Sequence, residues 1–154
     1  MTTVIPYRSD VSIFRPLAEK WAASVQNEAR EFGLTVDVDA HLRDLSGLTI
    51  DPQSIILVLL VDSNVAGYMG LRIFQNPLGP EWLAEEHYWF VDPERRGRNS
   101  LRLLEAAKEW AKASGCSHLK MNASRLASDL HDDVCRLYER KGMKAFETSY
   151  IERI

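Results

Sequence analysis

Apolar residues recur along this chain with two different spacings, and the spacings predict where helices and strands lie. After Asp10 the apolar residues repeat every three to four positions as far as Phe32, which predicts an amphipathic helix that stops at Gly33. The same spacing predicts further helices over residues 37–46, from about 98 to 114, and from about 130 to 142. Residues 46–52 contain glycine and proline, so we expect them to form a loop.

Strands are predicted where apolar residues alternate with polar ones or run without a break. Residues 54–61 are almost continuously apolar, as expected for a central strand that is covered on both faces. Residues 65–74 follow after a short polar turn, which predicts a hairpin, and Gly67 and Gly70 indicate a bulge or a close backbone approach. Shorter strands are predicted at residues 3–8, 85–91, 117–122 and 146–154. The helices and strands together predict an α/β (α+β) fold, layered around a mixed sheet.

Composition narrows the class of protein. A length of 154 residues with 45% hydrophobic content predicts one compact domain over residues 1–154. The net charge of −3 argues against a protein that mainly coats nucleic acid or an anionic membrane. The first residues lack the apolar core of a signal peptide, and no run approaches a membrane span, so we expect a soluble cytoplasmic protein. The cysteines and histidines lack metal-binding spacing, and no metal site is expected.

The stretch from Tyr88 to Leu104 is predicted to be a strand, a basic turn and the start of a helix. An aromatic and β-branched run ends at Val91, Pro93 stops the strand, and helical spacing begins near Arg98. A helix start exposes main-chain N–H groups and favours negative charge, so this turn predicts a site for pyrophosphate or another multiply charged anion. Four arginines crowd the turn: Arg95, Arg96, Arg98 and Arg102. Neither a Walker loop nor a Rossmann fingerprint is present, which disfavours kinases and nicotinamide enzymes.

Two segments resemble motifs of the GNAT superfamily of acyl-CoA-dependent N-acetyltransferases. Residues 91–104 fit V-x-P-x-x-R-G-x-x-x-x-x-L-L, which looks like the central motif of the family. Residues 137–143 read L-Y-E-x-x-G-M, which looks like its later Leu-Tyr-x-x-x-Gly-Phe segment. The resemblance covers about residues 50–154. It implies a GNAT fold, with a mixed, mostly antiparallel central sheet flanked by helices, in which the strands at 85–91 and 117–122 are parallel and splay apart around the cofactor arm.

The resemblance also implies acetyl-CoA as the co-substrate and indicates which residues contact it. Main-chain groups of the strand would pair with the pantetheine arm as an added strand does, and amides of the helix start, with arginines, would hold the pyrophosphate. The cofactor-binding residues are then Trp89, Phe90, Val91, Arg96, Gly97, Arg98, Asn99, Ser100 and Leu101. The family pattern is usually Arg-Gly-x-Gly-x-Gly/Ala. Asn99 is therefore expected to adopt the left-handed backbone of the second glycine, and Leu101 to narrow the approach to the helix.

Tyr138 matches the family tyrosine that protonates the departing thiolate. Its helical register with Val134 and Leu137 is equally compatible with a core aromatic. Acetyl transfer to an amine also needs the nucleophile to be unprotonated, which calls for a base or a water relay.

Glu85, Glu86 and His87 are the candidates for that base. Strict alternation places Glu85 and His87 on one face of the strand and Glu86 and Tyr88 on the other, so both carboxylates cannot serve one site. We prefer Glu86 as the base or as the residue that anchors the amine, and Glu85 and His87 are the second choices. An ordinary solvated strand end is the alternative.

The leading hypothesis is an N-acetyltransferase in which an amine attacks acetyl-CoA directly. Leu101 and the missing glycines favour an alternative, a catalytically inactive CoA-binding or protein-interaction domain. A nucleic-acid-binding domain would use the arginines, but the net charge argues against it. We expect a small-molecule or peptide amine as acceptor, no nucleic-acid or membrane partner, and a homodimer that forms through the terminal strand, Trp82 and Tyr150. Glu81, Glu85 and Glu86 would suit a cationic acceptor.

Overall fold

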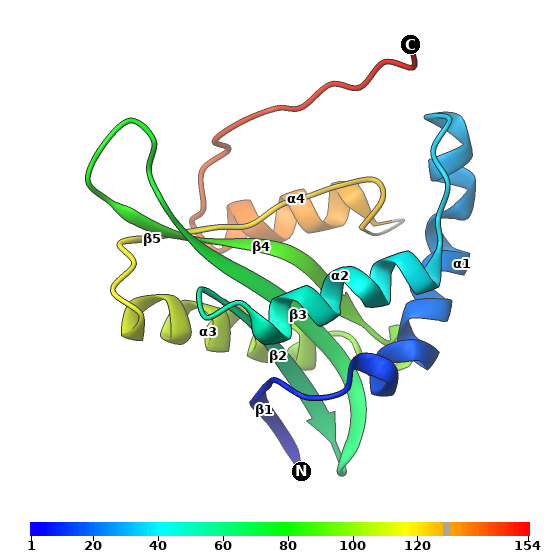
Figure 1. Cartoon of the computed structure of the whole chain (residues 1–154), viewed down its shortest axis with the longest axis horizontal. Helices are drawn as coiled ribbons and strands as arrows, with labels where there is room; N and C mark the ends of the chain where they lie inside the picture. Colours follow the sequence, from blue (N-terminus) through cyan, green and yellow to red (C-terminus); the bar gives the residue numbers. More distant parts are fainter. Residues whose placement is uncertain (128–129) are drawn as a thin grey trace.

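The computed structural model describes residues 1–127 and 130–154, which form one sheet with helices on both faces. The elements follow in the order β1 (Thr2–Tyr7), a 3-10 turn (Val11–Phe14), α1 (Arg15–Glu31), α2 (Val38–Ile50), β2 (Ser54–Val61), β3 (Asn64–Gln75), β4 (Trp82–Val91), a second 3-10 turn (Pro93–Arg95), α3 (Arg98–Ala113), β5 (His118–Lys120) and α4 (His131–Arg140) (Figure 1). None of the helices described is long and apolar enough to cross a membrane.

The sheet has five strands in the order β1-β2-β3-β4-β5, antiparallel except for the parallel pair β4 and β5. Helices α1 and α2 cover one face and α3 covers the other (Figure 1). The core is accordingly divided into two clusters, one around Phe14, Leu45 and Tyr68, the other around Met69 and Leu103. The predicted layered α/β fold with a mixed, mostly antiparallel sheet is confirmed.

The second helix is longer than its sequence pattern predicts. Residues 46–52 were expected to be a loop, but α2 continues to Ile50 because Leu48 extends the buried stripe of Leu42 and Leu45. Gly47 does not end the helix, since it has a helical backbone and open space around it. The helix ends after Ile50 because Asp51, its C-cap, has the extended backbone that is preferred before a proline.

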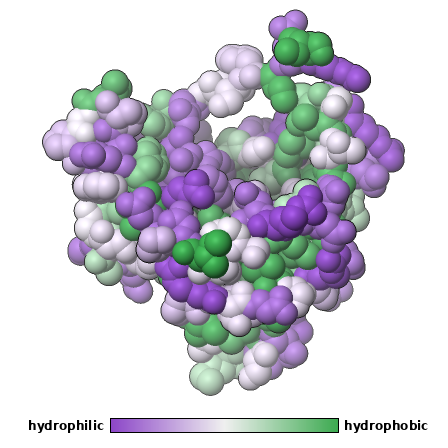
Figure 2. Space-filling model, viewed as in Figure 1, coloured by the Kyte–Doolittle hydropathy of each residue, from purple (hydrophilic) through white to green (hydrophobic). Residues whose placement is uncertain are grey.

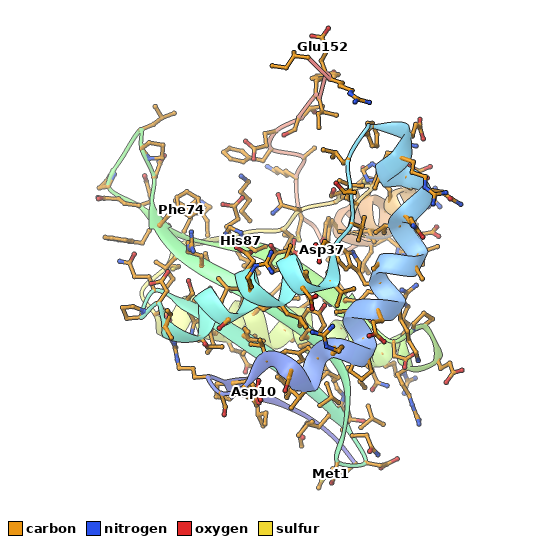
Figure 3. All side chains as sticks on the ribbon, turned by 45° about the vertical axis from the view of Figure 1, so that its right-hand side comes forward. Met1, Asp10, Asp37, Phe74, His87 and Glu152 are labelled. Carbon is orange, nitrogen blue, oxygen red and sulfur yellow. The ribbon has the colours of Figure 1, made fainter. Side chains whose placement is uncertain are left out.

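The predicted strand at 146–154 is wrong. Residues 143–154 have no regular secondary structure, and the apolar side chains from residue 144 onward, including Phe146 and Tyr150, are exposed. Strand β5 is only three residues long and offers too short an edge for pairing, so the clearest link to the sheet is an ion pair between Lys120 and Glu147. Figures 1 and 2 show this segment running clear of the sheet at the top of the view, and Figure 3 shows Glu152 at its far end.

Two glycines of β3 set how this strand meets β4. The register shifts between Gly70 and Leu71, where Gly70 pairs with Tyr88 but Leu71 pairs with Glu86, so His87 is the extra residue of a bulge. A Cβ atom on Gly67 would lie 2.8 Å from the carbonyl oxygen of Phe90 in β4. The predicted bulge and the predicted close approach are thus both present.

Replacing Gly67 by alanine is expected to lower the free energy of unfolding by about 1–3 kcal/mol, because the new methyl group meets backbone atoms that cannot move aside cheaply. Urea unfolding of the purified variant measures this change. Gly47→Ala is the matched control: its added methyl meets nothing within 4 Å, and it should stabilise α2 by about 0.5–1 kcal/mol. Equal stabilities for the two variants would show that the approach at Gly67 is looser than described.

Candidate active site

The parallel strands β4 and β5 separate soon after they meet. They pair only from Leu83 to Glu85, and beyond that point no described strand covers this edge of β4. The N–H of Asp92 donates to the carbonyl of Ala66 in β3 at 2.8 Å, so alternate residues of β4 turn their main-chain groups away from β3. Among the three strand residues predicted to contact the cofactor, Trp89 and Val91 therefore turn their main-chain groups to the open edge, whereas Phe90 turns its groups toward β3.

The turn after β4 leads into α3 through Gly97, which has a φ of 89°. Asn99 does not adopt the predicted left-handed backbone. It lies in the first turn of α3, and its side-chain amide donates to the carbonyl of Arg95 at 2.9 Å. The single glycine turns the chain, so no second left-handed residue is needed. The main-chain N–H groups of Ser100 and Leu101 donate hydrogen bonds to the Gly97 carbonyl. The N–H groups of Arg98 and Asn99 are left without an acceptor inside the helix.

The four arginines of the turn do not form one cluster. Arg96 donates through Nε to the carbonyl of Val91 at 3.0 Å, and its guanidinium lies over the Phe90 ring. Arg102 donates to the carbonyl of Thr2 at 3.1 Å and so ties α3 to β1. Arg98 is exposed at the helix start beside the free N–H groups, and a Cβ on Gly97 would meet nothing within 4 Å. This open turn has the donors and the space that a phosphate group needs.

The two candidate carboxylates lie in different surroundings. Glu86 is buried, with 2% of its surface exposed, and its Oε2 accepts the main-chain N–H of Asn122 at 3.0 Å. Burial raises the pKa of Glu86 to about 7, against the opposing effect of the Asn122 hydrogen bonds. Glu85 is paired with Lys120 at 2.8 Å near the surface. The sequence prediction that the two carboxylates cannot serve one site agrees with this arrangement.

The predicted sharing of one face by Glu86 and Tyr88 is wrong, and the bulge is the reason. Tyr88 points toward α2, where its hydroxyl donates to Asp44. Because His87 is an extra residue, Glu86 lies on the other face of β4, together with Trp89. His87 itself is exposed.

Tyr138 reaches the same place from α4. Its hydroxyl donates to the carbonyl of Asn122 at 2.9 Å, and its ring stacks on Trp89 with centroids 6.2 Å apart. Burial, with the nearby Glu86 as a lesser cause, raises the pKa of Tyr138, which keeps the hydroxyl protonated. Asn122 thus joins the carboxyl and the phenol. Sequence reasoning did not single out Asn122, although its place at the end of the predicted strand 117–122 could have indicated it.

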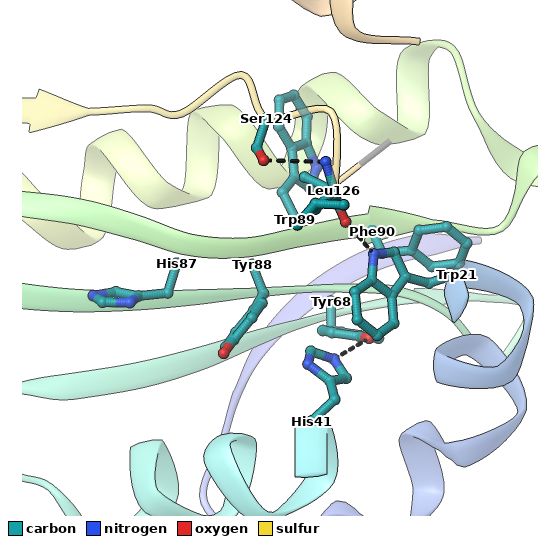
Figure 4. Close-up of a pocket in the computed structure, with 10 residues that line it drawn as sticks. Trp21, His41, Tyr68, His87, Tyr88, Trp89, Phe90, Ser124 and Leu126 are labelled. Carbon is teal, nitrogen blue, oxygen red and sulfur yellow. Dashed lines mark hydrogen bonds between the residues drawn. The ribbon is translucent and has the colours of Figure 1, made fainter. Parts of the chain in front are cut away.

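Two cavities share Trp89 as a lining residue. The smaller, of about 30 Å³, is lined by Glu86, Asn122 and Tyr138 among others. The larger, of about 180 Å³, lies toward α1 and α2 (Figure 4). Its lining residues are Trp21, His41, Tyr68, His87, Tyr88, Trp89, Phe90, Ser124, Leu126 and Ala127. Sequence reasoning missed Trp21 and His41, whose helical spacing marks them only as core residues.

Splayed parallel strands beside an open turn with free main-chain N–H groups are features of an acyltransferase of the GNAT type. The model of the acetyltransferase (GNAT) family matches residues 19–143, and the chain belongs to this family. Members transfer acyl groups to amine acceptors, and acetyl-CoA is the co-substrate. Apart from residues 128 and 129, no group of three or more His, Cys, Asp or Glu side chains is arranged to hold a metal ion.

Solved structures with the same fold are only distantly related in sequence. Ribosomal-protein-alanine N-acetyltransferase from Brucella melitensis biovar Abortus 2308 has a TM-score of 0.74 at 20% identity, covering 100% of this chain and 99% of its own. A transcriptional regulator from Bacillus halodurans C-125 has a TM-score of 0.78 at 16% identity, covering 100% of both chains. Aminoglycoside N-acetyltransferase AAC(6')-Iy in complex with CoA has a TM-score of 0.72 at 16% identity, covering 100% and 95%. No curated protein sequence matches the chain.

Proposed function

We propose that residues 1–154 form a single acyltransferase domain that transfers an acetyl group from acetyl-CoA to a primary amine by direct attack. The observation that carries this proposal is the meeting of Glu86 and Tyr138 at Asn122, beside the uncovered edge of β4. A proton acceptor with a pKa near neutrality and a protonated phenol lie there side by side, as transfer from an amine to a thioester requires.

The two side chains divide the proton transfers between them. Acetyl-CoA supplies a thioester carbonyl, which the amine attacks to form an amide while the carbon–sulfur bond breaks. Glu86, when ionised, accepts the proton that the amine must lose, and Tyr138 donates a proton to the departing thiolate. The sum is one proton moved from nitrogen to sulfur, after which Glu86 and Tyr138 regain their starting states by exchange with solvent.

The predicted cofactor-binding residues would hold the co-substrate in place and take no part in the proton transfers. The N–H groups of Arg98 and Asn99, with the exposed Arg98 guanidinium, would hold the pyrophosphate. Main-chain groups of Trp89 and Val91 would pair with the pantetheine arm. The indole N–H of Trp89 is buried and has no partner among the described residues, which is unusual for a buried donor and fits a polar group of the bound co-substrate.

A cytoplasmic location, the absence of nucleic-acid and membrane partners, and a homodimer stay predictions. The terminal strand no longer supports the homodimer, since it does not form. The other support remains, because Trp82 is 40% exposed and Tyr150 is 93% exposed. Light scattering coupled to gel filtration measures the oligomeric state directly.

Calorimetric titration with acetyl-CoA tests the proposed binding turn. We expect stoichiometric binding to the wild type and a Kd about tenfold higher for Arg98→Ala, because a charge-assisted phosphate contact contributes about 1.5 kcal/mol. Arg98 is a better choice than Arg96, whose guanidinium also holds the end of β4. Arg43→Ala, which removes an exposed arginine from α2, is the matched control and should bind as the wild type does. No binding at millimolar acetyl-CoA would mean that Leu101 closes the approach, and would favour a protein-interaction domain.

A further inference from the structure

We propose that the acceptor is a primary amine carried on one aromatic or similarly flat apolar body, and that the cavity toward α1 and α2 receives this body. The inference rests on the proposed function, because it names the substrate class of the same site. Four features of the cavity support it: its walls, its charge, its size and its position.

The walls of the cavity are aromatic and held in place by one another (Figure 4). The rings of Trp21 and His41 lie 4.6 Å apart, and His41 meets Tyr88 edge to face at 4.5 Å. His41 also shares a hydrogen bond of 2.8 Å with the hydroxyl of the buried Tyr68. Flat rings set at angles to each other offer stacking and edge-to-face contacts to a ring placed between them.

Among the residues that the structure describes, the cavity walls offer no negative charge to a polycation. None of its described lining residues carries a carboxylate, and burial lowers the pKa of His41 to about 4, which keeps this ring neutral. The adjacent carboxylate, Asp44, accepts the Tyr88 hydroxyl.

The acidic residues expected to attract a cationic acceptor are not gathered at the cavity. Glu81 accepts a hydrogen bond from Asn76 in the loop between β3 and β4, and Glu85 forms an ion pair with Lys120. Glu86 lines the smaller cavity instead. A polyamine or an aminoglycoside would therefore lose water from several charges without finding partners for them among the described residues.

The size of the cavity fits one ring. Its volume is about 180 Å³, and a cavity of about 150 Å³ in another protein is known to hold benzene. A phenyl or indole ring therefore matches this volume, whereas a multi-ring sugar exceeds it.

The position of the cavity would direct the amine toward the reacting groups. Trp89, Ser124 and Ala127 line both this cavity and the smaller one that contains Glu86 and Tyr138. A body seated among the aromatic rings thus lies one side chain away from the proposed base. A short alkyl linker between ring and amine would span that separation.

The segment that closes the cavity is fixed to α1, so the cavity exists before a ligand binds. The indole N–H of Trp21 donates to the carbonyl of Leu126 at 2.9 Å. Arg125, the preceding residue, is paired with Glu28 and Glu31 of the same helix. A preformed cavity loses little conformational entropy on binding.

Steady-state transfer assays with 2-phenylethylamine, 1,4-diaminobutane and kanamycin test the proposal. We expect kcat/KM for 2-phenylethylamine to exceed the other two by about tenfold or more, as expected when a ring finds a matching apolar pocket. Trp21→Leu should remove most of this preference, whereas Trp82→Leu, which changes an exposed tryptophan at the start of β4, should leave it unchanged. A preference for 1,4-diaminobutane or kanamycin, or a preference that survives Trp21→Leu, would overturn the proposal.

A charge-adding variant tests the same point in the opposite direction. Ser124 lines the cavity, and its hydroxyl accepts the N–H of Leu126, a bond that an aspartate can also accept. Ser124→Asp is therefore expected to fold and to raise the use of 1,4-diaminobutane relative to 2-phenylethylamine by about tenfold. An unchanged ratio would contradict the charge argument.

Calorimetry separates failure of this inference from failure of the proposed function. Titration of 2-phenylethylamine into the CoA-saturated protein reports on the cavity whether or not transfer occurs. Binding that weakens in Trp21→Leu supports the cavity assignment, and absent binding in a protein that does bind CoA overturns it. Absent CoA binding overturns the proposed function itself, and titration of the protein alone with 2-phenylethylamine then still decides the cavity.

Discussion

Glu86→Gln is expected to lower kcat by about 100- to 1,000-fold, the usual contribution of a positioned general base. The amide keeps the shape of the side chain and can still accept the N–H of Asn122, but it cannot take a proton from the amine. In the wild type, kcat should rise as the pH passes through about 7, because the ionised fraction of Glu86 rises there. That inflection should be absent from the pH profile of the variant.

The same substitution is expected to stabilise the protein at pH 8. The folded-state pKa of Glu86 lies near 7, above its ordinary value of 4.5, so the native state binds the proton more tightly than the unfolded state does. The protonated Glu86 therefore contributes to the free energy of unfolding, fully below pH 4.5, and this contribution is lost as the pH rises through 7. At 1.36 kcal/mol for each pKa unit, the loss amounts to about 3 kcal/mol. Glu86→Gln has no such cost. Its advantage in free energy of unfolding should grow between pH 4.5 and 7 in parallel urea titrations.

Glu85→Gln is the control for both measurements. Its carboxylate forms a partly exposed ion pair with Lys120, and such pairs contribute about 0–1 kcal/mol. We expect kcat and its pH profile to stay close to those of the wild type. Full activity in Glu86→Gln, or equal losses in both variants, would refute the assignment of Glu86 as the base.

Tyr138→Phe is expected to lower kcat by about 100-fold with little change in the KM for acetyl-CoA, at the low end of the range for general acids. The phenyl ring keeps its stacking on Trp89, so packing and co-substrate binding persist while the proton donor is lost. Initial rates over a range of acetyl-CoA concentrations separate the two parameters.

Tyr7→Phe provides a matched comparison, since it also removes a hydroxyl that donates to a main-chain carbonyl, that of Asp10 at 2.7 Å. Tyr7 lies in β1, at the opposite edge of the sheet from β5, and its loss should leave kcat unaltered. Equal kcat values for Tyr138→Phe and Tyr7→Phe would show that Tyr138 serves only as a core aromatic.

The parts of the fold that depend on local signals could be predicted from the sequence. The buried strand before Val91, the turn at Gly97 and the helix from Arg98 each have a signal in their own residues, namely an apolar run, a glycine and helical spacing. The same is true of the buried run at 54–61.

The parts that could not be predicted depend on distant partners. Alternation in residues 146–154 suits a strand, but a strand needs an edge to pair with, and the short β5 does not provide one. The faces of Glu86 and Tyr88 depend on a bulge opposite Gly70, which a count along β4 alone does not reveal. Asn122 gained its place only because β5 and α4 converge there.

The bulge at His87 also changes which residues of β4 face each side of the sheet. Residues before it and residues after it alternate in separate odd–even patterns, so Glu86 lines the smaller cavity and Tyr88, two positions later, lines the larger one. Deleting His87 would leave Glu86 opposite Leu71 and Tyr88 opposite Gly70, so both parts of the strand would keep their faces and the ladder would become regular. The register with β3, and not the count of residues along β4, therefore decides which of the two cavities Glu86 and Tyr88 line.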